Sequence, residues 1–351
     1  MKRFGRITLI GLTLFLTFCS LTWLHAQGLD VKPEYFIVKN FKLVSGEILS
    51  EMKVEYATLG KPQKDALGNI ANAVVSCHGW SGNYAQIKFM TDVVGPGKPF
   101  DTDKYFIICP TALGSPGSSS PSVSGLGPKF PKYTVSDMVS AQYTLITEHL
   151  KIKHLAGVFG ASMGGVQTLQ WITQYPDFMD WAIPVATSAA TKGRIAGIFG
   201  VMSYIIQSDS GYQGGTYKEQ PRKGMDTAFM GVYLWYFTPA YFKAKFKTND
   251  ELLKGLKDAG LGSAQMDAND IIWRNDALTK YDVSNELPKV KVRTLVVGVN
   301  SDELFPPEDE FIPIAKQIPG AKLFAYDSML GHMGCAFEIK KASQAIAEFL
   351  K

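Results

Sequence analysis

Short apolar segments recur along most of the chain, separated by polar stretches. Two of them, residues 35–41 and 52–60, flank a turn at Ser45-Gly46 and are typical of an opening pair of strands. Six later segments are almost continuously apolar, which is typical of parallel strands covered on both faces. They are residues 73–77, 105–109, 155–160, 181–186, 294–299 and 322–326.

Helical patterns lie between several of these segments. Residues 134–150 begin with Thr134 and carry Asp137 three positions later, which predicts a helix with a capping box. A second helix is predicted directly after Ser162, and an amphipathic helix over residues 339–350 closes the chain. The alternation of strands and helices predicts an α/β fold with a mostly parallel, doubly wound sheet.

The alternation stops between residues 190 and 287, where Gly, Met, Tyr and Phe become frequent and strand signals fade. We interpret residues 190–287 as a helical lid insertion between two parts of the core, residues 30–189 and 288–351. Many of its aromatic residues are accounted for by the insertion's own core. The loop 111–131 is long and aperiodic, and because it follows a strand we expect it to line the functional site.

The first 26 residues have the composition of a secretory signal peptide. Three basic residues among the first six precede an uncharged run over residues 7–24, and a cleavage position follows Ala26. We therefore expect residues 1–26 to direct export to the periplasm or the medium, without integral membrane association after cleavage. Leu24 is large for its position before the cleavage site, which leaves an uncleaved membrane anchor as the alternative.

Composition and charge narrow the classes of partner. The chain of 351 residues is 46% hydrophobic and 19% charged, as ordinary globular proteins are. Cleavage of the signal would lower the formal net charge from +4 to +1, which gives no reason to expect nucleic acid as a partner. Whether the chain forms a homodimer does not follow from its composition.

The cysteines and histidines indicate neither a disulfide framework nor a metal site. Cys77, Cys109 and Cys335 would remain after cleavage, an odd and widely spaced set that is typical of small buried thiols. No Cys/His cluster has the spacing of zinc ligands, so we expect no metal and no cofactor.

The segment Gly160-Ala161-Ser162-Met163-Gly164 fits the pattern G-x-S-x-G between a predicted strand and a predicted helix. In that context small residues permit a sharp turn that exposes the serine hydroxyl, and the next backbone N–H is open to an oxyanion. We predict Ser162 as a nucleophile and the Met163 N–H as an oxyanion donor. The alternative is a glycine-rich turn that only packs against the sheet.

A serine hydroxyl needs a base to take its proton. In this architecture the chain order is serine, acid and histidine, which selects His332 as the base. Asp302 is the first acidic residue after the strand at 294–299 and is predicted to orient the imidazole, with Glu303 as the fallback.

His78 lies in the segment CHGWSG (77–82), directly after the strand at 73–77. A His-Gly turn at this place supplies a second backbone oxyanion donor in related architectures, and counting along the turn selects the Trp80 N–H. We expect His78 to lie at the substrate pocket with a structural rather than a catalytic role.

These segments together resemble the homoserine O-acetyltransferase family of the α/β-hydrolase superfamily. The resemblance implies Ser162, Asp302 and His332 as a catalytic triad, with the Trp80 and Met163 N–H groups as oxyanion donors. It extends over nearly all of the mature chain and rests on residues 95–109, 130–142, 160–171, 182–187, 212–217, 266–270, 301–309 and 331–338.

The resemblance does not fix the acyl acceptor. The family's acetyltransferases carry an arginine that holds the homoserine carboxylate, and Phe229 stands where that arginine is expected. An apolar ring at this place of the pocket does not bind a carboxylate. Arg222 and Arg274 are the candidates to replace it. The segment HGWSG is also typical of hydrolases, whereas the transferases tend to have a non-glycine second residue.

Three functions follow from these observations. The first is an exported serine hydrolase that cleaves a small ester-type acyl substrate. The second is a CoA-dependent O-acyltransferase, for which acetyl-CoA would be the co-substrate. The third is a binding domain that keeps the fold without catalysis, against which the complete set of Ser162, His332 and Asp302 argues.

Overall fold

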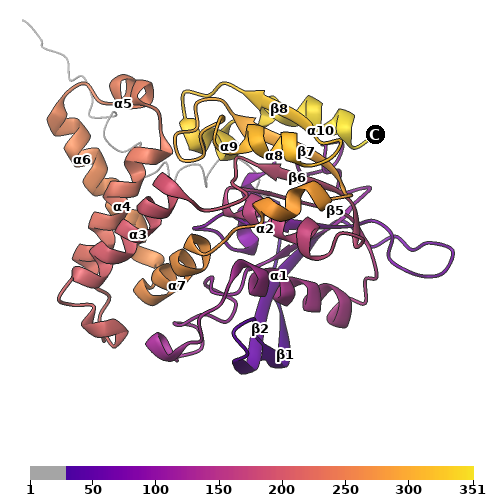
Figure 1. Ribbon diagram of the computed structural model, residues 1–351, viewed down its shortest axis with the longest axis horizontal. Helices are drawn as coiled ribbons and strands as arrows, with labels where there is room; N and C mark the ends of the chain where they lie inside the picture. The colour runs from indigo at the N-terminus through magenta and orange to yellow at the C-terminus, as the bar shows by residue number, and fades with distance from the viewer. Residues whose placement is uncertain (1–28) are drawn as a thin grey trace, which may run out of the picture.

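The computed structural model describes residues 29–351 (Figure 1), so the predicted signal peptide lies outside the described residues and stays a prediction. Eight strands form one sheet in the order β1-β2-β4-β3-β5-β6-β7-β8. The strands are β1 (Glu34–Lys42), β2 (Ile48–Leu59), β3 (Ala73–Cys77), β4 (Phe106–Pro110), β5 (Leu155–Ala161), β6 (Met179–Val185), β7 (Arg293–Val299) and β8 (Lys322–Tyr326).

The sheet is antiparallel between β1, β2 and β4, and parallel from β4 to β8. All eight segments predicted from the sequence form strands, and the main difference is that β2 begins at Ile48, before the predicted start. The predicted α/β-hydrolase fold is therefore confirmed. Because β5, β6, β7 and β8 run in parallel, their carboxyl ends lie along one edge of the sheet, where residues from distant parts of the chain meet.

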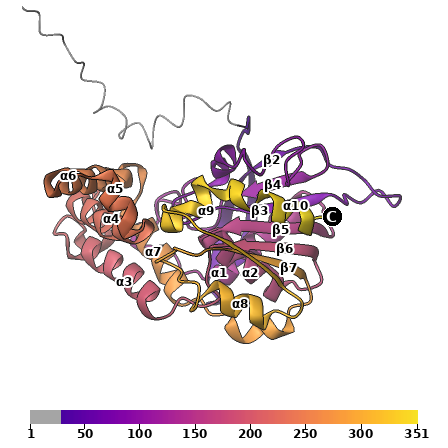
Figure 2. The ribbon, with the colours of Figure 1, turned by 90° about the horizontal axis from the view of Figure 1, so that it is seen from above.

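Helices cover both faces of the sheet (Figure 2). Residues of α1, α2 and α8 pack in one hydrophobic cluster, whereas α10 packs in a second cluster on the other face. The helices are α1 (Val135–Thr144), α2 (Met163–Gln174), α3 (Gly193–Ser208), α4 (Arg222–Tyr236), α5 (Pro239–Lys245), α6 (Asn249–Gly260), α7 (Ala268–Thr279), α8 (Phe311–Gln317), α9 (Gly334–Phe337) and α10 (Ser343–Phe349).

The predicted capping box at Thr134 and Asp137 is present at the start of α1. The helix itself is shorter than predicted, because a wider turn over Leu145–His149 follows it. The closing helix also differs from the prediction, since a 3₁₀ segment (Ile339–Ala342) precedes α10. A 3₁₀ turn stacks residues three positions apart, so Ile339 and Ala342 can both face the core.

Five helices, α3 to α7, lie between β6 and β7 and form a separate group beside the sheet (Figure 1). The chain enters and leaves this group through one neck, where Ala190 and Asp282 form an isolated antiparallel bridge. The Tyr281 hydroxyl donates to the Val166 carbonyl of α2 at 3.2 Å, which ties the neck to the core. The predicted insertion therefore consists of helices, as its composition indicated.

The expectation that the loop 111–131 lines the site is wrong, because none of its residues borders the cavity beside Ser162. Its serine hydroxyls are instead used to hold the surrounding structure. Ser118 and Ser119 accept hydrogen bonds from backbone N–H groups of β2, and Ser120 donates to Asp270 of α7 at 3.1 Å. The loop thus connects the sheet to the insertion through its buried residues 118–121, whereas residues 122–126 are exposed.

Within residues 29–351, no helix has both the length and the apolar character that crossing a membrane requires.

The packing of α2 against the loop after β3 yields a first prediction. A Cβ at Gly164 would overlap the backbone carbonyl of Cys77, whereas a Cβ at Gly197 of α3 meets no atom within 4 Å. We expect Gly164→Ala to lower the free energy of unfolding by about 2–4 kcal/mol, because backbone must move to accept the methyl group. Gly197→Ala should raise the free energy by up to about 1 kcal/mol. Urea unfolding of both variants measures the difference, and equal midpoints would contradict this account of the packing.

Candidate active site

Ser162 lies at the turn between β5 and α2, with φ 59° and ψ −123°. This region of backbone space costs a residue with a Cβ about 1–3 kcal/mol, and the surrounding packing must hold it there. Gly160 and Gly164 permit the turn, because a Cβ on either would overlap backbone atoms. The Ser162 N–H donates to the Val185 carbonyl at 2.9 Å, which fixes the turn to β6.

The structure brings Ser162, His332 and Asp302 into one hydrogen-bonded chain. His332 Nε2 lies 3.0 Å from Ser162 Oγ, and His332 Nδ1 lies 2.7 Å from Asp302 Oδ2. An ionised carboxylate only accepts, so the proton sits on Nδ1 and the Nε2 lone pair faces the serine hydroxyl. Asp302, and not the fallback Glu303, takes the position beside the imidazole.

Asp302 and His332 are both buried. The other oxygen of Asp302 accepts from the backbone N–H groups of Leu304 and Phe305, each at 2.9 Å. These bonds compensate the carboxylate for the water it has lost. His332 follows Gly331, whose φ of 57° and closeness to the Tyr236 carbonyl favour a residue without a Cβ.

His78 is buried and its tautomer follows from its partners. The Ala112 N–H donates to His78 Nε2 at 2.9 Å, so Nδ1 carries the proton and donates to the Gly79 carbonyl at 2.7 Å. The Gly79 N–H in turn donates to Gln86 Oε1 at 2.6 Å. Both sides of the Gly79 residue are thereby fixed, and with them the peptide that carries the Trp80 N–H.

Trp80 and Ser162 border the same cavity. The Trp80 indole N–H donates to Asn275 Oδ1 of α7 at 2.9 Å. Met163 is the first residue of α2, where the backbone N–H has no acceptor within the helix. The N–H groups of Trp80 and Met163 therefore belong to the two turns that flank the Ser162 hydroxyl.

The cavity beside Ser162 has a volume of about 160 Å³ and a mostly apolar wall. Phe199 of α3 and Tyr236 of α4 contribute from the insertion, and sequence reasoning did not single out either of them. The predicted pocket residue His78 borders the cavity. Cys77, Cys109 and Cys335 also border it; all three are free and buried, as the sequence indicated.

Phe229 does not border this cavity. The prediction that Phe229 is a residue of the substrate pocket is therefore wrong. Its ring centre lies 5.7 Å from the ring centre of Trp80, which does border the cavity. The two candidate arginines are also engaged elsewhere. Arg222 bonds Asp226 and Ser263, whereas Arg274 donates to the backbone carbonyls of Trp80 and Gly114.

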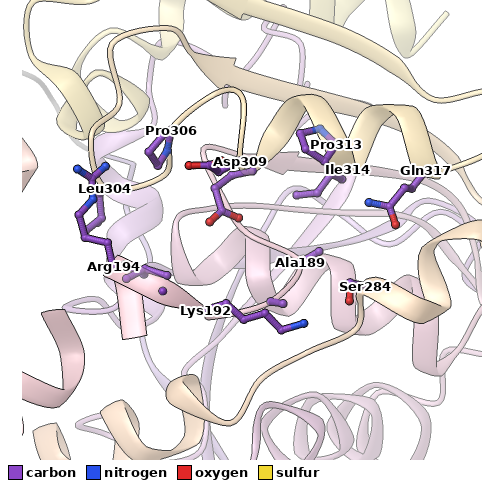
Figure 3. A pocket seen from close by; sticks show the side chains of 14 residues that line it. Ala189, Lys192, Arg194, Ser284, Leu304, Pro306, Asp309, Pro313, Ile314 and Gln317 are labelled. Atoms are coloured by element: carbon purple, nitrogen blue, oxygen red, sulfur yellow. The ribbon is translucent and has the colours of Figure 1, made fainter. Parts of the chain in front are cut away.

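A larger cavity of about 520 Å³ lies beyond Leu304, which borders both cavities (Figure 3). Lys192 and Arg194 from the start of the insertion face Asp309 and Gln317 across it. Ser162 and His332 are not among its lining residues, so we place the candidate active site at the smaller cavity. Within residues 29–351, no group of three or more His, Cys, Asp or Glu side chains is arranged to hold a metal ion.

Comparisons with known proteins agree with this geometry. Residues 72–338 match the family model described as the alpha/beta hydrolase fold. A probable acyltransferase of Methanothermobacter thermautotrophicus is 40% identical over 321 residues, which cover 92% of this chain and 98% of the relative. A homoserine O-acetyltransferase of Chloroherpeton thalassium is 30% identical, covering 89% of this chain and 88% of the relative. Among solved structures, the acetyl esterase MekB matches with a TM-score of 0.83 and 26% identity, covering 91% of this chain and 96% of its own.

The fold and the strand-turn-helix around Ser162 define a member of the α/β-hydrolase superfamily. The chain belongs, within that superfamily, to the family of the homoserine O-acetyltransferases, as its motifs indicated.

Two titratable groups, the buried His78 at the site and the half-buried Glu310 at the larger cavity, give opposite dependences of stability on pH. Burial lowers the pKa of His78 to about 4, from an ordinary value of about 6.5. Between these values the unfolded chain binds more protons, so protonation lowers the free energy of unfolding by about 3 kcal/mol as pH falls from 6.5 to 4. Burial, together with Asp309 and Asp302, raises the pKa of Glu310 to about 7. The folded chain then holds the extra proton, and stability decreases as pH rises from about 4.5 to 7.

We expect Glu310→Gln to remove the loss of stability with rising pH that Glu310 causes. The gain of stability with rising pH that His78 causes should remain. The free energy of unfolding of Glu310→Gln, measured by urea titration at pH 4.5, 5.5 and 6.5, should rise more steeply with pH than that of the unmodified chain. The exposed Glu308→Gln, on the same loop, is the matched control and should follow the unmodified chain. Parallel pH curves for all three proteins would contradict the assignment to Glu310.

Proposed function

We propose that this protein is a serine hydrolase that cleaves a carboxylic ester with a short acyl group through an acyl-enzyme on Ser162. The observation that carries the proposal is the hydrogen-bonded chain from Ser162 Oγ through His332 to buried Asp302, at the wall of an apolar cavity. Acyl transfer through a serine requires a nucleophile, a base whose lone pair is directed at it, and an acid that fixes the base.

The reaction follows from these positions. His332 Nε2 takes the proton of Ser162 Oγ while the oxygen attacks the ester carbonyl carbon, and the carbonyl oxygen becomes an oxyanion. The N–H groups of Trp80 and Met163 donate to that oxyanion, and losing one such donor costs about 3–4 kcal/mol of transition-state stabilisation. His332 then gives its proton to the leaving alcohol, which leaves Ser162 acylated. A water molecule, deprotonated by His332, releases the acid and restores the serine.

The wall of the cavity favours water over an amino acid as the acyl acceptor. Among the described residues that border it, none is an arginine or a lysine. Arg194, at the start of the insertion, donates to the Glu303 carbonyl and lies over the Trp235 ring. A carboxylate such as that of homoserine would therefore enter without a cationic partner, and burying it unpaired is costly.

A CoA-dependent O-acyltransferase is the second candidate, because a homoserine O-acetyltransferase is 30% identical to this chain over most of both chains. Acetyl-CoA would then acylate Ser162 in the same way, and a bound alcohol would replace water in the second step. The two functions share the first half of the reaction and differ in what enters the cavity after it.

The two functions are distinguished by substrate. We expect the purified protein to cleave p-nitrophenyl acetate and to release no CoA from acetyl-CoA, with or without homoserine. Ser162→Ala should lower kcat/KM by about 10⁴-fold or more, because the nucleophile is lost. Ser210→Ala, an exposed serine on the loop after α3, is the control and should keep full activity. Homoserine-dependent CoA release would instead establish the transferase, and an active Ser162→Ala variant would refute the site.

The size of the cavity predicts a preference for short acyl groups. Its volume of about 160 Å³ is well below the roughly 300–1,000 Å³ of sites that hold drug-sized ligands. We expect kcat/KM for p-nitrophenyl acetate or butyrate to exceed that for the decanoate by about tenfold or more, because the longer chain has no apolar surface to cover it.

Ile339 borders the cavity, so Ile339→Ala should shift the preference toward longer chains. Ile346→Ala, buried on the same side of the sheet but away from the cavity, should not. Equal shifts in both variants would contradict this assignment of the acyl site.

A further inference from the structure

The helix α7 belongs to the insertion, yet two of its consecutive residues hold the turn that carries the Trp80 N–H. Arg274 donates through Nη1 to the Trp80 carbonyl at 2.7 Å, and Asn275 Oδ1 accepts from the Trp80 indole at 2.9 Å. The guanidinium also lies 5.4 Å from the Trp80 ring centre. One contact fixes the main chain of Trp80 and the other fixes its side chain.

The burial of Arg274 is unusual for a charged group. Only 1% of the residue is exposed, and both of its hydrogen bonds go to main-chain carbonyls, those of Trp80 and Gly114, rather than to a carboxylate. Its Nε has no hydrogen-bond partner among the described residues. The buried Asp270, one turn earlier on α7, attracts the guanidinium but forms no hydrogen bond with it, since its carboxylate accepts from Ser120 and Ser122. Burying a cation without a hydrogen-bonded anion opposes folding, and an apolar side chain of similar volume is commonly neutral or stabilising at such a place. Stability therefore does not account for the guanidinium.

The contacts on the other side of Trp80 complete the arrangement. His78 Nδ1 donates to the Gly79 carbonyl, which belongs to the same peptide as the Trp80 N–H. Because a trans peptide is planar, fixing this carbonyl fixes the direction of the N–H on the opposite side. Arg274 fixes the next peptide along the chain, so the backbone of Trp80 is held at both ends.

Resting on the proposed function, we propose that Arg274, assisted by Asn275, is a positioning residue that directs the Trp80 N–H at the oxyanion formed on Ser162. A donor contributes fully to the transition state when it is already aligned with the position of the developing charge. Misplacement of the Trp80 turn weakens that bond in the transition state more than the binding of the neutral ester, so it lowers kcat and leaves KM nearly unchanged.

Three variants test the role of Arg274, with p-nitrophenyl acetate as the substrate and the full chain as the protein. Arg274→Met keeps the approximate volume and removes the donors, and we expect kcat to fall about 10- to 100-fold with KM changed less than about threefold. Arg274→Lys restores one donor and the charge, and should recover part of kcat. Trp80→Phe removes only the indole N–H, and should lower kcat by a smaller factor with the fold retained.

Trp273→Phe is the matched control. Trp273 neighbours Arg274 on α7, is buried, and also donates to a loop carbonyl, that of Phe130, at 2.9 Å. Its loss should lower the unfolding midpoint without changing kcat by more than about twofold, because the Phe130 loop does not border the cavity. If Trp273→Phe lowers kcat as much as Arg274→Met does, the effect belongs to α7 as a whole and the inference is overturned.

A trifluoromethyl ketone such as 1,1,1-trifluoro-2-butanone gives a readout that a purely structural role would not move. The Ser162 oxygen adds to the ketone carbonyl carbon while His332 takes the hydroxyl proton, and the former carbonyl oxygen becomes an oxyanion that the Trp80 and Met163 N–H groups would bind. We expect its Ki to rise in Arg274→Met by about the factor by which kcat/KM falls. An unchanged Ki and kcat in folded Arg274→Met overturns this inference alone. A wild-type chain that neither cleaves the ester nor binds the ketone overturns the proposed function as well.

Discussion

The backbone of Ser162 adopts φ 59° and ψ −123°, which a residue with a Cβ does not hold without support from its surroundings. That support comes from close backbone packing at Gly160 and Gly164, where α2 meets the loop after β3 with no room for a side chain. The same contact that permits the turn also places the Cys77–Trp80 segment against the start of α2. The position of the serine and the positions of the two proposed oxyanion donors are thus consequences of one packing constraint.

The insertion is part of the site rather than only a cover over it. Phe199 and Tyr236 form part of the cavity wall, and α7 bonds both the main chain and the indole of Trp80. The Thr238 hydroxyl donates to the Met329 carbonyl, which connects the insertion to the turn that carries His332. Movement of the insertion would therefore disturb both the turn that carries Trp80 and the turn that carries His332.

Esterases and O-acyltransferases on this fold share an acyl-serine, and their difference lies in which nucleophile reaches it. Water needs only access, whereas a specific alcohol needs binding groups and a site dry enough for it to compete. In this chain the arginines that could bind a carboxylate are used to bind carbonyl oxygens or acidic side chains. The family relationship alone therefore does not define the acceptor, and the engagement of each cation is what supports water in our proposal.

The sequence alone determined the order of strands and helices, the turn at Ser162 and the choice of Asp302 and His332. Those features depend on local patterns, such as apolar runs, glycine spacing and the position of a residue after a strand. Such patterns can be recognised in the amino-acid sequence itself. It did not determine that the loop 111–131 bonds β2 and α7, that Phe229 packs on Trp80 outside the cavity wall, or that Arg274 binds backbone. Each of these depends on which distant segments pack together, about 190 residues apart for Arg274 and Trp80, and only the tertiary structure decides that because such contacts leave no periodic signal along the chain.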